Sequence, residues 1–208
     1  MNIFANRSHF DMSAKPLPPL ILASSSPYRK ELLSRLRLPF RCESPHLDET
    51  PLPSESPQAT CERLARAKAE HIARSHPDAL VIGSDQVAVL KGRLLGKPGN
   101  HENALRQLRE ASGEEAVFHT AVCLYNAASG HSQLERVPVT VRYRPFGEAE
   151  IERYLAADQP YDCAGSGRIE TLGITLVEWV RSDDPTALIG LPLIALSRML
   201  RAEGFLLP

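Results

Sequence analysis

The sequence predicts an α/β fold in which a mixed β-sheet carries helices on its faces. Short apolar segments of strand character alternate with amphipathic segments of helical spacing along residues 20–203. Two longer strand-like segments, 117–125 and 137–143, then follow one another with no helix between them, as antiparallel neighbours do. A purely parallel sheet needs a crossover at that point, so a mixed sheet fits this order of elements better.

The bulk composition is that of a globular protein without the overall basic charge that a nucleic acid polymer would attract, so any phosphate site must be built from a few residues. The 208 residues allow one large domain or two small lobes with a sizeable core. The formal net charge is -1, whereas proteins that bind a nucleic acid polymer usually carry a basic excess. No apolar run is long enough for a membrane span or a signal peptide. The four cysteines show no metal-binding spacing, which favours reduced thiols in a cytoplasmic protein.

The amino-terminal half is expected to begin with a leader and then to form two strand–helix pairs. Residues 1–19 mix polar residues with three prolines and predict a loosely ordered leader, in which Met12 is an alternative start. Serine is a favourable helix cap and proline a favourable first helical residue. We therefore expect a strand at 20–23, a helix at 28–37 capped by Ser26, a strand at 40–43, a loop at 44–56, and a helix at 57–75 capped by Ser56.

The carboxyl-terminal half is expected to supply the remaining strands and three helices. Its segments are bounded by turn residues, and Asn100 is suited to cap a helix. We expect a strand at 79–83 that ends at Ser84-Asp85-Gln86, a hairpin over 87–95 that turns at Lys91-Gly92, a helix from Asn100 to 111, the paired strands 117–125 and 137–143, a helix at 148–157, a strand at 174–180, and a helix at 191–203.

The segment after the first strand has the features of an anion site at a helix N-terminus. Ser24, Ser25 and Ser26 lead into a helix whose first N–H groups are unpaired, and their hydroxyl groups add further donors. Arg29 lies in the first turn, where a cation is favourable only beside an anion. The alternative is a plain helix cap with solvated basic residues.

Lys68 is expected on the buried face of its helix. It shares a stripe with Cys61, Leu64, Ala65 and Ile72 at spacings of three or four residues. A buried ammonium group needs an anionic partner. The alternative is a lysine that snorkels to solvent from the edge of the stripe.

Two carboxylates are candidates for binding a metal ion or a water molecule. Asp85 follows an apolar strand, and ligands of α/β sheets collect beyond the carboxyl ends of strands. The alternative for Asp85 is an ordinary turn aspartate. Glu49 lies beside Asp48 in a proline-rich loop, and Lys97 lies in a constrained Gly-Lys-Pro turn. Such cations and carboxylates together suit triphosphate chemistry, which requires charge neutralisation and oxygen ligands for a divalent cation.

A series of motifs along the chain resembles the Maf family of nucleotide pyrophosphatases. In chain order they are A-S-S-S-P-Y-R-K-E-L-L (23–33), L-D-E-T-P (47–51), L-A-R-A-K-A (64–69), I-G-S-D-Q (82–86), G-K-P (96–98), C-A-G-S (163–166) and G-L-P-L (190–193). The resemblance implies a single Maf/ITPase-like domain over 20–208. It implies that an elongated mixed sheet carries two lobes with a cleft between them, often in a homodimer.

The resemblance also implies an activity and a set of roles. Members hydrolyse a nucleoside triphosphate to the monophosphate and pyrophosphate with Mg²⁺ or Mn²⁺. The functional residues that it implies are Arg29, Glu49, Lys68, Asp85 and Lys97. We expect a catalytic base at Asp85, metal binding by Glu49 and Asp85, and phosphate binding by Arg29, Lys68 and Lys97 together with Ser24 and Ser26 of the serine loop.

Three departures from the general pattern resemble the branch of the family that acts on 7-methyl-GTP. Tyr28 stands where members usually have arginine, Gln86 stands in place of threonine, and Glu170 replaces the glutamine of the thymidine/uridine branch. An aromatic face and a carboxylate suit a cationic base, although helix-start packing is the alternative for Tyr28. The alternative functions are a pyrophosphatase for dTTP, UTP or another non-canonical nucleotide, and a non-catalytic nucleotide-binding regulator of cell division.

Overall fold

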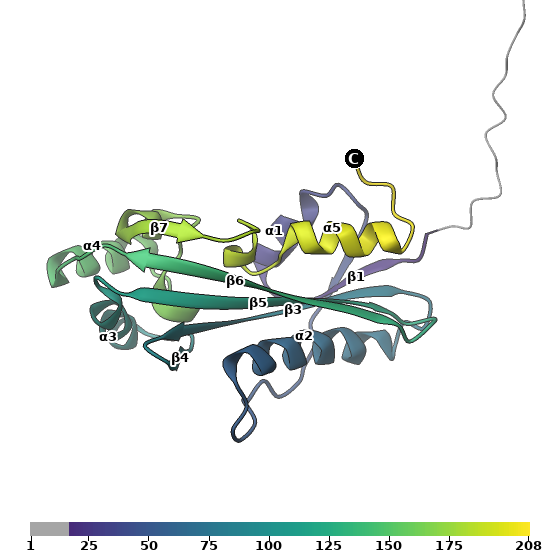
Figure 1. Ribbon diagram of the computed structural model, residues 1–208, viewed down its shortest axis with the longest axis horizontal. Coiled ribbons are helices and arrows are strands. Elements are labelled where there is room, and N and C mark those ends of the chain that lie inside the picture. Colours follow the sequence, from purple (N-terminus) through teal and green to yellow (C-terminus); the bar gives the residue numbers. More distant parts are fainter. Residues whose placement is uncertain (1–16) are drawn as a thin grey trace, which may run out of the picture.

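The computed structural model describes residues 17–208, in which a single seven-stranded sheet runs the length of the molecule (Figure 1). The order is β2-β1-β3-β5-β6-β7, with β4 paired to β3. β1 is parallel to β2 and β3, and the remaining pairs are antiparallel. The predicted elongated mixed sheet is confirmed. The strands are β1 (Leu20–Ala23), β2 (Arg41–Glu43), β3 (Leu80–Leu90), β4 (Arg93–Leu95), β5 (Glu115–Asn126), β6 (Ser132–Tyr143) and β7 (Val177–Arg181).

Helices flank both faces of this sheet, as the sequence predicts. Within residues 17–208 the α-helices are α1 (Pro27–Ser34), α2 (Pro57–Ala73), α3 (His101–Ala111), α4 (Glu148–Asp158) and α5 (Leu193–Ala202). Figure 1 shows α1 and α5 on one face, α2 on the opposite face, and α3 and α4 towards one end of the sheet. None of these helices is long and apolar enough to cross a membrane. The expected leader lies outside the described residues except for 17–19, which have no regular structure.

The three predicted helix caps are confirmed. The side chain of Ser26 accepts a hydrogen bond from the N–H of Arg29, that of Ser56 from Ala59, and that of Asn100 from Asn103. Each cap satisfies one of the N–H groups that a helix leaves unpaired at its start. The helix ends were predicted less well, since α1 ends at Ser34 rather than 37 and α2 at Ala73 rather than 75.

The prediction that the third strand ends at 83 is wrong. β3 continues to Leu90, because β5 pairs with it along its whole length. The polar residues that suggested an ending have hydrogen-bond partners within the fold, so they do not interrupt the strand. Asp85 therefore lies in the middle of a strand and not beyond its carboxyl end. The last strand is also displaced, since residues 172–176 form a 3₁₀ helix before β7 begins at Val177.

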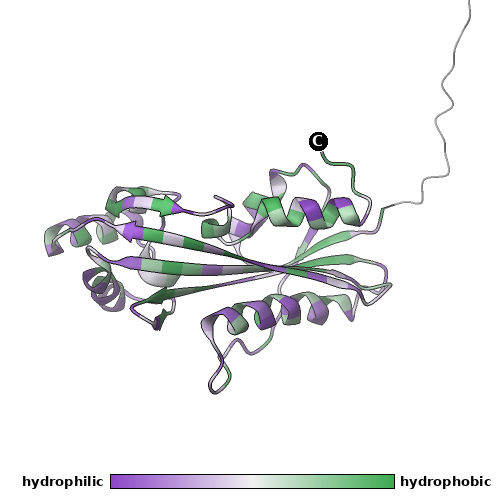
Figure 2. Ribbon diagram, viewed as in Figure 1, coloured by the Kyte–Doolittle hydropathy of each residue, from purple (hydrophilic) through white to green (hydrophobic). Residues whose placement is uncertain are grey.

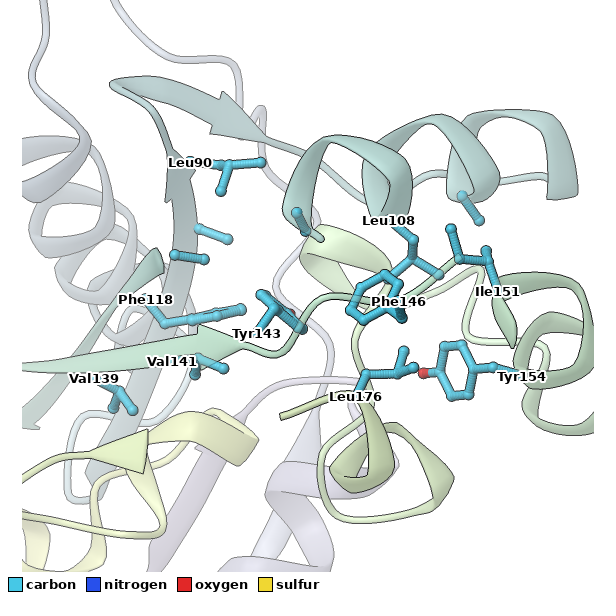
Figure 3. Packing of buried hydrophobic residues seen from close by; sticks show 14 of the residues in the cluster. Leu90, Leu108, Phe118, Val139, Val141, Tyr143, Phe146, Ile151, Tyr154 and Leu176 are labelled. Atoms are coloured by element: carbon cyan, nitrogen blue, oxygen red, sulfur yellow. The ribbon is translucent and has the colours of Figure 1, made fainter. Parts of the chain in front are cut away.

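Three clusters of buried residues lie along the sheet, and we call the end with α3 and α4 one lobe and the end with α1, α2 and α5 the other. One cluster lies among α3, α4 and the adjoining end of the sheet, where Tyr143, Phe146, Ile151 and Tyr154 pack together (Figure 3). The other two lie on opposite faces of the other end, beneath α1 and α5 and beneath α2. Figure 2 shows hydrophobic residues along much of the strands, whereas the helices carry both hydrophobic and hydrophilic residues. β3 and β5 contribute residues to all three clusters.

The order of the first three strands creates a crevice at the end of β1. The connection from β1 to β2 places α1 on one face, and the return from β2 to β3 places α2 on the other. Ligands of α/β sheets bind at such a reversal, outside the carboxyl end of the strand. β1 pairs with β3 only as far as Gly83, and β4 begins to pair at Ala88. Among the described strands, none pairs with residues 84–87 of β3 along the edge that β1 and β4 occupy.

Candidate active site

A cavity of about 320 Å³ opens beside the uncovered segment of β3. This volume lies in the range of small-ligand pockets. The cavity brings together every residue that the sequence suggested for the site, from segments far apart in the chain. The predicted residues that line it are Ser24, Ser26, Tyr28, Arg29, Glu49, Lys68, Asp85, Gln86, Lys97 and Glu170.

Lys68 lines the cavity and pairs with both candidate carboxylates. Its Nζ donates to Asp85 Oδ1 at 2.6 Å and lies 2.8 Å from Glu49 Oε1. The residue is only 5% exposed, so the predicted inward orientation is confirmed and the snorkelling alternative is excluded. A buried ammonium group with two carboxylate partners fixes both carboxylates in direction.

Gly83 allows α2 to approach β3 closely enough for this contact. A Cβ atom at residue 83 would lie 2.0 Å from the Ala65 carbonyl oxygen and 2.8 Å from the Ala69 nitrogen. Only glycine fits such an approach. Lys68 lies on the same face of α2, so the close packing brings its side chain to Asp85. Burial raises the pKa of the Asp85 carboxyl group, and Lys68 and Arg29 oppose this shift.

The two carboxylates are suited to a hard divalent cation. Within residues 17–208, Asp85 Oδ2 and Glu49 Oε2 make no hydrogen bond or ion pair. The same residues contain no group of three or more His, Cys, Asp or Glu side chains placed to hold a metal ion. Mg²⁺ is often bound by one or two carboxylates, with phosphate oxygens and water completing its octahedron. Asp48 has another role, since its Oδ1 accepts hydrogen bonds from the Thr50 N–H and hydroxyl.

The serine loop combines a helix cap with donors that remain free. Ser24 Oγ accepts the Ser26 N–H at 3.1 Å, and Ser26 Oγ accepts the Arg29 N–H at 3.4 Å. Each hydroxyl oxygen is used as an acceptor, and its hydrogen can still be donated to an anion. The plain cap is therefore present at Ser26, and it is compatible with an anion site.

Arg29 is aimed by a contact that the sequence did not predict. Its Nε donates to the Gly190 carbonyl oxygen at 2.9 Å, and Ser84 Oγ lies 2.8 Å from the same oxygen. Gly190 has a φ of 119°, and a Cβ there would lie 3.4 Å from Arg29 Nε. The terminal nitrogens of Arg29 make no hydrogen bond in the described part of the chain, so they can bind an anion. In the sequence, the glycine of the G-L-P-L motif (190–193) marks this position as unusual, but nothing there indicates that Arg29 contacts it.

A second group of contacts at the cavity is built around the aromatic ring of Tyr28. Tyr28 Oη donates to Asp162 Oδ2 at 3.3 Å, and the Arg168 guanidinium carbon lies 5.6 Å from the Tyr28 ring centroid. Burial raises the pKa of Tyr28 to about 12, so the phenol is neutral. Partial desolvation beside the cavity raises the pKa of Glu170, although the residue is exposed, and Arg168 opposes this shift. Asp162 and Arg168 were not among the predicted residues.

Gln86 is used partly by the protein itself. Its Nε2 lies 2.8 Å from Thr120 Oγ1 and 3.0 Å from each of the Ala187 and Leu188 carbonyl oxygens. An amide nitrogen carries two hydrogens, so both are engaged by these acceptors. Oε1 is the atom that remains for a ligand, so Gln86 can offer a ligand an acceptor but no donor.

Comparison with known proteins gives a consistent family. A model described as Maf-like protein matches residues 19–203. A protein from Cupriavidus pinatubonensis named 7-methyl-GTP pyrophosphatase is 56% identical over 194 residues, 93% of this chain and 98% of its own. Proteins of the same name from Aromatoleum aromaticum and Ralstonia nicotianae are 56% and 57% identical, covering 91% and 88% of this chain and 97% and 95% of their own. The chain therefore belongs to the Maf family.

Proposed function

We propose that the protein hydrolyses a nucleoside triphosphate to the monophosphate and pyrophosphate, with 7-methyl-GTP as its preferred substrate. The observation that carries this proposal is that the lining of one cavity contains both kinds of group. Arg29, Lys68 and Lys97 offer cations, and Tyr28 and Glu170 offer an aromatic face and a carboxylate.

This combination of groups complements the charges of 7-methyl-GTP. The triphosphate is anionic, whereas methylation at N7 gives the guanine ring a delocalised positive charge. Cations attract the triphosphate, and an aromatic face with a nearby carboxylate attracts the methylated guanine ring. The names of the similar proteins support the same substrate.

The residues divide the chemistry among them. Glu49 and Asp85 would hold Mg²⁺ or Mn²⁺, which supplies electrophilic stabilisation of the phosphate oxygens when bound. Asp85 orients the attacking water and accepts its proton. Arg29 and Lys68 neutralise the charge that develops on the phosphates, together with Lys97 and the hydroxyl groups of Ser24 and Ser26. Positioning and electrostatics account for most of the catalysis in such a site.

A pyrophosphate-release assay tests the proposal. We expect the highest kcat/KM with 7-methyl-GTP among 7-methyl-GTP, GTP, dTTP and UTP, and loss of turnover when EDTA removes the divalent cation. Preference for dTTP or UTP would assign the protein to the alternative substrate class. Binding of nucleotide without release of pyrophosphate would indicate a regulator. The homodimer and the cytoplasmic location, which the sequence analysis also expects, remain predictions.

Replacement of Glu170 by glutamine is expected to lower kcat/KM for 7-methyl-GTP by roughly tenfold or more, the scale of one partly exposed charge contact. GTP lacks the positive ring, so its hydrolysis should change much less. Steady-state kinetics with both substrates measure the difference, and Glu178→Gln on the exposed edge strand is the matched control. An equal loss for both substrates would assign Glu170 to support of the whole site, and no loss would refute its role in base selection.

A further inference from the structure

Tyr28, Asp162 and Arg168 form a closed group at one wall of the cavity. Tyr28 Oη donates to Asp162 Oδ2 at 3.3 Å, and Arg168 Nη2 donates to Asp162 Oδ1 at 2.8 Å. The guanidinium group of Arg168 also lies over the Tyr28 ring, with 5.6 Å between its carbon and the ring centroid. Each residue contacts the other two, so the phenol is held both at its hydroxyl group and on one face.

Arg168 is itself anchored to one lobe. Its Nη1 donates to the Asp158 carbonyl oxygen at 3.0 Å, and its backbone N–H donates to Tyr154 Oη at 2.9 Å. Tyr154 belongs to the core drawn in Figure 3, and the Arg168 side chain is 15% exposed. Tyr28 lies in α1, which packs on the core of the other lobe. The group therefore ties the aromatic wall to the opposite lobe.

The group also distinguishes two carboxylates of the cavity. Tyr28, Asp162 and Glu170 line the cavity, whereas Arg168 does not, although its guanidinium group lies over the Tyr28 ring. Both carboxylate oxygens of Asp162 are engaged, and its charge is compensated by Arg168. Within residues 17–208, the Glu170 side chain makes no hydrogen bond or ion pair. Glu170 is thus left available to a ligand, while Asp162 is used by the protein.

We propose that Arg168 and Asp162 are positioning residues that fix the Tyr28 ring as a wall for the cationic base of the substrate. The inference rests on the proposed function, because it takes 7-methylguanine as that base. An unrestrained phenol has several rotamers, and ligand binding then includes the cost of ordering the side chain. A ring that is already fixed removes this cost for a base that stacks on it. The contacts with the phosphates are not affected.

Replacement of Arg168 by methionine tests the proposal, since it removes the guanidinium group and keeps an unbranched stem. We expect KM for 7-methyl-GTP to rise by about tenfold while kcat stays within about twofold. The ratio of kcat/KM for 7-methyl-GTP to that for GTP should fall. A residue that only supports the fold would lower kcat/KM for both substrates by the same factor and leave this ratio unchanged.

Matched variants separate positioning from stability. Arg144 donates to a backbone carbonyl and pairs with Glu150 without lining the cavity, so Arg144→Met should leave the substrate ratio unchanged. If Arg168→Met does not fold, Arg168→Lys keeps the charge but loses the planar fork and should give an intermediate ratio. Tyr28→Phe and Asp162→Asn, made singly and together, should have non-additive effects, because Asp162 acts through the Tyr28 hydroxyl group.

The outcomes distinguish this inference from the function on which it rests. A wild-type preference for 7-methyl-GTP that persists in Arg168→Met overturns the inference and leaves the proposed function standing. Additive effects of Tyr28→Phe and Asp162→Asn overturn it as well. A wild-type protein without preference for 7-methyl-GTP overturns the proposed substrate and the inference together.

Discussion

Replacement of Asp85 by asparagine is expected to lower kcat for pyrophosphate release by at least about a hundredfold, the usual contribution of a positioned general base. Asparagine keeps the size of the side chain but cannot take a proton from water. Asp85 is 5% exposed and its Oδ1 is held by Lys68 at 2.6 Å, so the direction of Oδ2 is fixed. Nucleotide binding should persist, because the variant removes a negative charge from a phosphate site.

Kinetics and calorimetric binding of the product nucleotide measure the two effects separately. Asp78→Asn, at an exposed position just before β3, is the matched control and should have the kcat of the wild-type protein. Near-normal kcat in Asp85→Asn would remove this residue from the mechanism. Restoration of kcat by excess Mn²⁺ would assign Asp85 to metal binding and not to proton transfer.

Replacement of Lys68 by alanine is expected to raise KM for the triphosphate by about tenfold or more, because a buried, charge-assisted phosphate contact is lost. kcat should fall as well, since Lys68 holds Glu49 and Asp85 in place. The free energy of unfolding should fall by less than the about 3–5 kcal/mol that removal of one partner from a buried ion pair usually costs. The Glu49 side chain is 55% exposed and can turn to solvent, and Arg29 still compensates Asp85.

Thermal unfolding and steady-state kinetics of the same preparation test this balance. Lys91→Ala is the control, because Lys91 forms an exposed pair with Glu114 at 3.0 Å and such pairs contribute about 0–1 kcal/mol. Unchanged KM in folded Lys68→Ala would show that the ammonium group does not bind phosphate. A large fall in Tm with normal KM would assign Lys68 to a structural ion pair.

Local rules were sufficient for the parts of the site that depend on neighbouring residues. The burial of Lys68 followed from helical spacing, because one face of α2 packs on the sheet along its whole length. The caps at Ser26 and Ser56 followed from serine chemistry, because a cap hydrogen bond spans three residues. The charged residues were grouped by what triphosphate chemistry requires, and the Maf motifs match the same positions.

Contacts between distant segments could not be predicted in the same way. The run of Ser84, Asp85 and Gln86 looked like the end of a strand, because polar side chains in a buried strand are explained only by their tertiary partners. Arg29 and Gly190 lie 161 positions apart, and Tyr28 and Asp162 lie 134 apart. No local pattern specifies the partner of a side chain at such separations.

The two lobes share strands, and this limits how the molecule can move around a nucleotide. A hinge needs a few residues that are free to change φ and ψ. β3 offers none, because every residue from Leu80 to Leu90 is paired with β5 across the junction of the lobes. Opening and closing are therefore expected of segments without strand pairing that border the cavity, among them 44–56 and 160–170. The first carries Glu49 and the second carries Asp162, so product release should be timed by loop rearrangement and not by separation of rigid bodies.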